Sequence, residues 1–139
     1  MSHELILIVD YGSQYTQLIA RRIREQRVFC RIVPPQRLTP EMIQADRPKG
    51  IILSGGPNSV YQTGAPLPDP AVFESGIPTL GICYGMQAMS HLLGGQVEHT
   101  PAREYGKAPV RILAPEGLFV QVKPESVSWM SHGDSVVRP

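Results

Sequence analysis

A cysteine between two glycines, in the segment GICYGMQ at residues 81–87, is the first candidate for chemistry in this sequence. The pattern GICYG matches a nucleophile elbow in which cysteine stands where a hydrolase has serine. Glycine two positions before and after the nucleophile removes side chains that would clash in the tight turn from strand to helix. The helix that follows points its positive end at the sulfur, which favours the thiolate. The segment therefore predicts that Cys83 is a nucleophile.

Two backbone N–H groups are candidates for stabilising the negative oxygen that forms when a cysteine attacks a carbonyl group. One belongs to Tyr84, directly after the cysteine, and the other to Gly56 in the segment SGGPNS. That segment could also be a phosphate-binding loop, but it has no G-K-[ST] ending and Pro57 removes a donor. We expect an oxyanion hole built from Gly56 and Tyr84, with an ordinary turn as the alternative for the glycine-rich segment.

A base that could assist the cysteine must come from one of four histidines: His3, His91, His99 and His132. His3 is near the terminus, and His91 lies inside the helix expected after the cysteine. His132 follows a predicted strand in SWMSHGDS, with Asp134 two residues further on. The residue types by themselves therefore predict a triad of Cys83, His132 and Asp134.

The segments around these residues alternate between strand and helix patterns. Apolar and β-branched runs predict strands at 5–10, 28–33, 50–53 and 78–82. Apolar residues at helical spacing predict a helix at 14–26, and an N-cap at Thr39 before Pro40 predicts another from residue 40 onward. Further helices are predicted at 70–75 and at 84–93, the second ended by Gly94-Gly95. This alternation predicts a three-layer, mainly parallel, flavodoxin-like α/β sheet with helices on both faces. Segments 10–12 and 54–57 and Cys83 should meet at the carboxyl ends of its strands.

The pattern changes after Gly95. The segments APVRILA, LFVQV and SVSWM predict short strands with no helices between them, in a hairpin-rich edge or flap. No repeat or linker indicates a second domain, and 139 residues suit one domain with its own core.

Composition narrows the class of protein. With 42% hydrophobic and 18% charged residues, the chain has the composition of a globular protein, and no apolar run approaches the ~18 residues that cross a bilayer. No cleavage signal follows the first residues, so we expect a cytoplasmic protein without membrane contact. A net charge of +1 argues against a nucleic-acid partner, and the arginines at 21, 22, 24 and 27 are interpreted as a solvated helix face. Cys30, among apolar neighbours, is expected to be structural, and the two cysteines predict no metal site.

Four ordered segments carry a resemblance to a known family: ILIVDYGSQYTQLIARRIRE, IILSGGPNSVY, GICYGMQ and WMSHGD. Together they resemble the class I (triad) glutamine amidotransferases, and within this family the members that serve purine-nucleotide synthesis. The resemblance covers essentially the whole chain. It implies that Cys83 attacks the side-chain amide of L-glutamine, which releases ammonia, and that the glutamyl thioester is then hydrolysed. It also implies an oxyanion hole from Gly56 and Tyr84. The substrate contacts that it implies come from Gln87 and from a loop at 131–134, formed by Ser131, His132, Gly133 and Asp134.

The resemblance replaces the triad that the residue types predict. In this family the catalytic histidine and glutamate come from a His-Pro-Glu motif beyond the SHGD segment, and residues 1–139 contain no such motif. We therefore expect an amidotransferase domain over 1–139 that is incomplete at its C-terminus and that shows no steady turnover of glutamine by itself. The resemblance further implies that this domain needs no cofactor and that ammonia passes to a synthetase (ATP pyrophosphatase) domain of the same enzyme, which uses ATP and Mg²⁺. The whole enzyme is expected to be a homodimer.

Three alternatives remain open at this stage. The chain could be the amidotransferase of another pathway, such as anthranilate or carbamoyl-phosphate synthesis. It could be a relative that binds glutamine without turnover, or a protein of similar fold that uses Cys83 as a redox sensor.

Overall fold

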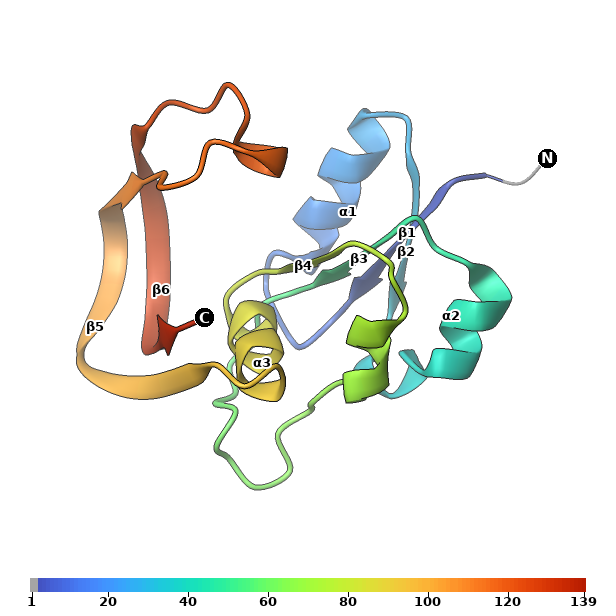
Figure 1. Cartoon of the computed structure of the whole chain (residues 1–139), viewed down its shortest axis with the longest axis horizontal. Helices are drawn as coiled ribbons and strands as arrows, with labels where there is room; N and C mark the ends of the chain where they lie inside the picture. The colour runs from blue at the N-terminus through green and yellow to red at the C-terminus, as the bar shows by residue number, and fades with distance from the viewer. Residues whose placement is uncertain (1–2) are drawn as a thin grey trace. The chain divides into compact units, whose positions relative to one another are not determined.

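The computed structural model describes the backbone of residues 3–139 and their side chains, except those of 100–105 and 131–132. Figure 1 shows the elements in chain order. By its contacts the chain divides into two compact units. The first contains Met1–Val97 with Val136–Pro139, and the second contains Glu98–Ser135.

A four-stranded sheet forms the centre of the first unit. Its strands are β1 (Leu5–Val9), β2 (Phe29–Val33), β3 (Gly50–Leu53) and β4 (Thr79–Gly81), in the order β2-β1-β3-β4. All three strand pairs are parallel. This order is that of flavodoxin-like sheets, in which the chain reverses direction across the sheet after β2. The predicted strands and the predicted parallel sheet are confirmed.

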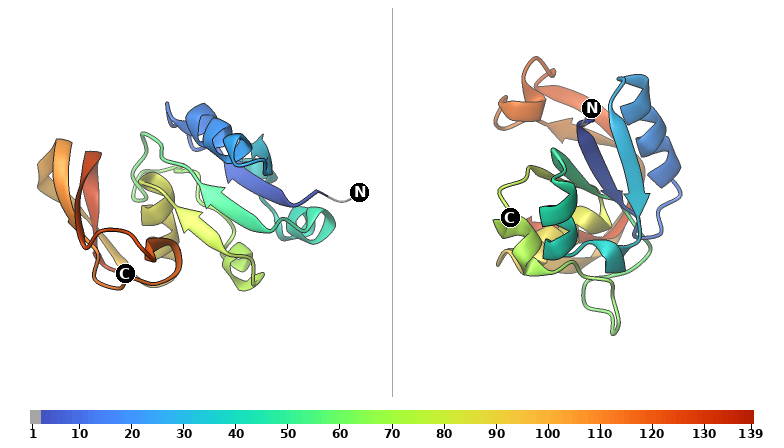
Figure 2. Two further views of the ribbon diagram at one scale, coloured as in Figure 1. Left: turned by 90° about the horizontal axis from the view of Figure 1, so that it is seen from above. Right: turned by 90° about the vertical axis from the view of Figure 1, so that its right-hand side faces the viewer.

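Helices cover both faces of this sheet (Figure 2). Apolar side chains of β1 point alternately to the two faces, so both faces must be covered. Leu7 and Val9 point to the face covered by α2 (Pro40–Asp46) and α3 (Tyr84–Leu92), in the larger apolar cluster. Ile8 points to the opposite face and packs with Ala20 of α1 (Thr16–Glu25). Because both faces are buried, β1 must be apolar throughout, which is why LILIV reads as an unbroken run.

Local signals fix the ends of these helices. The Thr39 side chain accepts a hydrogen bond from the Met42 N–H at 3.1 Å, with Pro40 as the first helical residue, so the predicted N-cap is confirmed. After α3, Gly94 takes a φ of +91°, which ends the helix at low cost. Short 3₁₀ turns occupy Pro35–Arg37 and Pro70–Glu74, the second where a short helix was predicted.

Two predictions about α1 and its neighbour β2 are confirmed. Residues 21, 22, 24 and 27 are exposed, and Arg22 pairs with Glu25 at 3.1 Å, so the arginines form a solvated face. Cys30 is buried under α1, where its Sγ lies 3.5 Å from the Ala20 carbonyl oxygen. Its role is structural.

The chain after α3 differs from the predicted pattern. Two long strands, β5 (Gln96–Arg111) and β6 (Glu125–Arg138), pair with each other in a separate two-stranded sheet. The prediction of a strand at LFVQV is wrong, because this segment contains a 3₁₀ turn at Gly117–Phe119 and connects the two strands. The prolines at 115 and 124 remove backbone donors on either side of it. The predicted loop at 131–134 is also wrong, since β6 continues through it.

Candidate active site: a cysteine elbow between beta 4 and alpha 3

Cys83 occupies a strained turn at the end of β4. Its φ is +50° and its ψ is −114°, and α3 begins at the next residue. Left-handed backbone of this kind costs about 1–3 kcal/mol for a residue with a side chain, so it persists only where the surrounding structure imposes it. The residue is exposed. The turn therefore holds the thiol out from the backbone, as the GICYG pattern predicts.

The two flanking glycines are required because backbone atoms pack against them. A Cβ atom at Gly81 would lie 2.6 Å from the Met86 Cα, inside the first turn of α3. A Cβ atom at Gly85 would lie 2.3 Å from the Leu53 carbonyl oxygen, at the end of β3. Backbone atoms cannot move aside as a flexible side chain can. The predicted reason for both glycines, the avoidance of a steric clash, is confirmed.

The glycine-rich loop after β3 lies against the elbow. A Cβ atom at Gly55 would lie 3.2 Å from the Cys83 Cβ, and one at Gly56 only 2.1 Å from the Tyr11 carbonyl oxygen. The buried Ser54 hydroxyl accepts from the Tyr11 N–H at 3.0 Å and donates to the Gly55 carbonyl at 3.0 Å. The loops after β1, β3 and β4 therefore meet at one place, as the sheet topology predicts.

Both predicted oxyanion donors have no acceptor within the described part of the chain. Tyr84 is the first residue of α3, where an N–H has no partner inside the helix. No hydrogen bond from the Gly56 N–H is found among the described residues either. Both amides thus keep a hydrogen-bond donor that no described residue uses, and their role as an oxyanion hole stays a prediction.

The predicted substrate residues fall in different parts of the molecule. Gln87 is buried in α3 and its N–H donates to the Cys83 carbonyl at 3.0 Å. Gly133 and Asp134 lie in β6 and belong to the second unit, and the side chains of Ser131 and His132 lie outside the described residues. Among the described side chains, the Asp134 carboxylate has a neighbour that the sequence did not indicate. The His99 Nδ1 lies 2.9 Å from its Oδ1.

A pair of tyrosines lies at the base of the elbow. The rings of Tyr11 and Tyr84 are 5.3 Å apart between centroids and almost fully buried. The Tyr84 hydroxyl donates to the Pro66 carbonyl at 2.9 Å, whereas the Tyr11 hydroxyl is buried without a hydrogen-bond partner among the described residues. Burial raises the pKa of both hydroxyls, and Tyr84 raises that of Tyr11 further. Sequence reasoning missed this pair, because a tyrosine in DYG or CYG carries no local sign of burial.

The Tyr11 side chain leads to a prediction about alkaline pH. Tyr11 of the unfolded chain loses its proton at about pH 10, whereas Tyr11 of the folded chain keeps it. The free energy of unfolding therefore falls as the pH rises above about 10. Each such tyrosine contributes a slope of about 1.4 kcal/mol per pH unit. Tyr11→Phe should therefore be more stable than wild type at neutral pH, since it removes an unpaired buried hydroxyl, and should lose less stability between pH 10 and 11. Urea unfolding at pH 8, 10 and 11 measures both effects. An identical pH dependence in the two proteins would contradict the burial of this hydroxyl.

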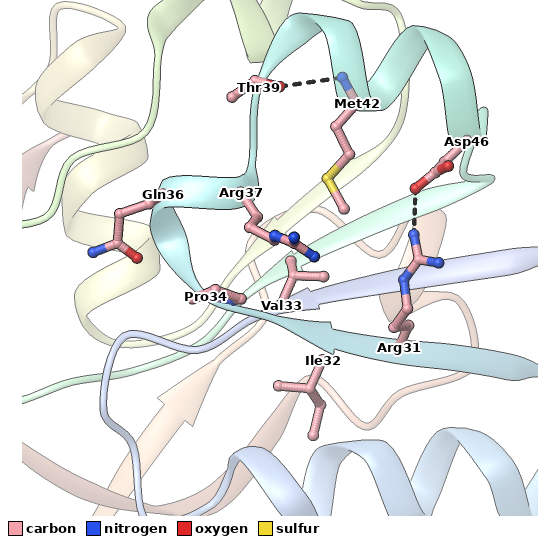
Figure 3. Close-up of a pocket in the computed structure, with 9 residues that line it drawn as sticks. All are labelled: Arg31, Ile32, Val33, Pro34, Gln36, Arg37, Thr39, Met42 and Asp46. Atoms are coloured by element: carbon pink, nitrogen blue, oxygen red, sulfur yellow. Dashed lines mark hydrogen bonds and ion pairs between the residues drawn. The ribbon is translucent and has the colours of Figure 1, made fainter.

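A separate cavity of about 580 Å³ lies at β2, the strand at the other edge of the sheet from β4 (Figure 3). Arg31 forms an ion pair with Asp46, and Arg37 extends over Val33. Because the cavity does not include Cys83, we do not assign the cysteine chemistry to it. Among the described residues, no group of three or more metal-ligating side chains is found, and no helix is long and apolar enough to cross a membrane.

The sheet order and the elbow define a class of protein: flavodoxin-like α/β proteins that present a cysteine at a strand-to-helix turn. The family model for class-I glutamine amidotransferases matches residues 7–138. The chain belongs to this family.

Within this family, the chain is similar in sequence to GMP synthases. The chain is 56% identical over 135 residues to a GMP synthase (glutamine-hydrolyzing) of Bacillus velezensis, covering 97% of the chain and 26% of the relative. It is 53% identical over 134 residues to that of a Synechocystis species, covering 96% of the chain and 24% of the relative. The chain thus spans about a quarter of the length of these relatives.

Solved structures show the same fold. A putative GMP synthase protein from Thermoplasma acidophilum superimposes with a TM-score of 0.78 at 26% identity, covering 99% of this chain and 68% of that one. A glutamine amidotransferase from Thermotoga maritima has a TM-score of 0.76 at 20% identity, over 100% of this chain and 64% of that one. At that identity the second likeness concerns the fold alone.

Proposed function

We propose that this chain is the glutaminase part of a GMP synthase. It would hydrolyse L-glutamine and supply ammonia for the amination of XMP to GMP in purine biosynthesis. The observation that carries the proposal is the strained, exposed Cys83 in a chain 56% identical to a glutamine-hydrolyzing GMP synthase over 97% of its length. The matched relatives given above favour this pathway over the other amidotransferases considered from the sequence.

The chemistry proceeds by acyl transfer to the cysteine. The Cys83 thiolate attacks the side-chain amide carbon, and the carbonyl oxygen becomes an oxyanion held by the Gly56 and Tyr84 amides. The carbon–nitrogen bond then breaks, the nitrogen takes up a proton from water and leaves as ammonia, and a glutamyl thioester remains. Water attacks this thioester, which releases glutamate and restores the thiol. In this family the histidine of the His-Pro-Glu motif activates that water, so residues 1–139 by themselves should complete this step slowly. α3 begins at the residue after Cys83, so the positive end of its dipole lies beside this residue.

The other parts of the proposal concern the substrate and the longer protein. Gln87, Ser131, His132, Gly133 and Asp134 are proposed to hold the α-amino and α-carboxylate groups of glutamine. A synthetase portion would bind ATP and Mg²⁺ and consume the ammonia. The glycine-rich loop here does not suit a phosphate, because Pro57 has no N–H and Gly56 packs directly against the Tyr11 carbonyl. A homodimeric whole enzyme and a cytoplasmic location stay predictions.

Labelling with a chloroketone analogue of L-glutamine tests the proposal, because capture needs the thiolate and the substrate site but no turnover. The thiolate displaces chloride, and the thioether is located by mass spectrometry. We expect saturable labelling at Cys83, protection by L-glutamine, and much slower labelling by the D-enantiomer. Equal labelling by both enantiomers, without protection, would instead support a redox-sensing thiol. Modification of Cys30 with Cys83 untouched would contradict the proposed nucleophile.

A further inference from the structure

The loop that carries Gly56 is long and contains neither helix nor strand. It runs from the end of β3 to the 3₁₀ turn at Pro70–Glu74, over residues 54–69 (Figure 1). At its start it is fixed by backbone bonds, since the Ser54 N–H donates to the Val9 carbonyl and the Ser54 carbonyl accepts from Gly85. Gly56 lies just beyond these bonds. A loop of this length needs further contacts to hold one of its amides in place.

Two tyrosine hydroxyls supply such contacts. The Tyr84 hydroxyl donates to the Pro66 carbonyl at 2.9 Å, across 18 residues of sequence. The Tyr61 hydroxyl donates to the Val97 carbonyl at 2.5 Å, and its ring packs edge-on against His91 of α3 with centroids 5.4 Å apart. The first contact joins Tyr84 of α3 to Pro66 of the loop, and the second joins Tyr61 of the loop to Val97 of β5. The loop is therefore connected both to α3 and to the start of the strand that follows it.

Tyr84 has two proposed roles in this arrangement. Its N–H is one proposed oxyanion donor, and its hydroxyl holds the loop that carries the other. Burial raises the pKa of the Tyr84 hydroxyl, so the group keeps its proton and donates throughout the neutral range. This hydrogen bond is part-buried, and its loss leaves the Pro66 carbonyl without this donor.

We propose that the hydroxyls of Tyr84 and Tyr61 are positioning groups. They act as a latch, which means that they hold the 54–69 loop in the position where the Gly56 and Tyr84 N–H groups donate to the same oxygen atom. The inference rests on the proposed function of Cys83 as an acyl-forming nucleophile. It adds that loss of either hydroxyl slows only reactions that develop an oxyanion. Removing a whole oxyanion donor slows acyl transfer about 10²–10³-fold, so loosening one donor should slow it about tenfold.

The test compares two reagents on the same thiol. With a γ-glutamyl para-nitrophenyl ester, the thiolate attacks the carbonyl carbon through an oxyanion, the carbon–oxygen bond breaks, and para-nitrophenolate is released in a burst as the glutamyl-enzyme forms. With iodoacetamide, the thiolate displaces iodide and no oxyanion develops. We expect Tyr84→Phe to slow the burst about tenfold with an unchanged iodoacetamide rate, and Tyr61→Phe to act in the same direction with a smaller effect.

Tyr11→Phe is the matched control, because the Tyr11 ring lies 5.3 Å from the Tyr84 ring and the change also removes one tyrosine hydroxyl. Unlike the Tyr84 hydroxyl, the buried Tyr11 hydroxyl has no hydrogen-bond partner among the described residues. The burst of Tyr11→Phe should equal that of wild type. If Tyr84→Phe does not fold, Tyr61→Phe still tests the latch, since Tyr61 is 60% exposed. Wild-type burst rates in the variants that fold would overturn the inference, as would equal slowing of both reactions. No burst in the wild type would instead overturn the proposed function.

Discussion

Cys83→Ala is expected to abolish capture of the glutamine chloroketone completely while leaving thermal unfolding close to that of the wild type. The thiolate is the only atom of the elbow that forms a bond in this reaction, so no neighbouring group replaces it. The Cβ atom is retained, and with it the strained backbone at a φ of +50°. Intact-mass measurement after reagent treatment, together with a thermal melt, checks both parts.

Two further variants separate the chemistry from the fold. Cys83→Gly should also fail to react but should be more stable by about 1 kcal/mol, because glycine adopts this backbone conformation without strain. Cys30→Ala should react at the wild-type rate but be less stable, since Cys30 is buried beneath α1. Labelling that persists in Cys83→Ala and disappears in Cys30→Ala would reverse the assignment of the two cysteines.

Gly85→Ala should strongly destabilise the fold, because the added methyl group would clash with backbone atoms at the end of β3. The new Cβ would lie 2.3 Å from the Leu53 carbonyl oxygen and 2.6 Å from the Leu53 Cβ. Relief requires α3 to move away from the end of β3, which breaks the Gly85–Ser54 backbone hydrogen bond. We expect about 3 kcal/mol or more of destabilisation, well beyond the gain in helix propensity of about 1 kcal/mol. Urea unfolding measures it, and chloroketone capture should fall with it.

Gly50→Ala is the matched control for this change. Its Cβ would also be close to a neighbour, 3.0 Å from the Ile6 Cδ1, but that atom is the end of a flexible side chain. The side chain can rotate, so the cost should stay within about 1 kcal/mol. If Gly50→Ala and Gly85→Ala were equally destabilised, backbone contact at the elbow would not be what requires glycine there.

The residues of the elbow could be predicted from sequence because the geometric requirement is local. A turn from strand to helix within residues 81–85 excludes side chains at its first and last positions, whatever the rest of the chain does. The alternating strands and helices were predictable for a similar reason. Apolar runs and caps such as Thr39 act within one element, and the parallel order follows from the short connections between them.

The long strands after α3 show where local pattern was insufficient. A β pattern indicates that a segment can be a strand, but its length depends on a partner. β5 and β6 extend through 16 and 14 residues because each pairs with the other, which turns the expected SHGD loop into strand. LFVQV has the same β-type composition, but it lies in the connection between the two strands, and its first two residues belong to a 3₁₀ turn.

The sequence by itself determined the class of fold, the position of the thiol and the two glycines that expose it, because each depends on neighbours a few residues away. Only the tertiary structure decided which residues far apart in the sequence contact one another. The contacts of Tyr84 with Pro66, Tyr61 with Val97, and His99 with Asp134 join residues 18, 36 and 35 positions apart. Such pairs form when packed elements bring a donor and an acceptor within hydrogen-bond distance, and neither residue carries a local sign of its partner.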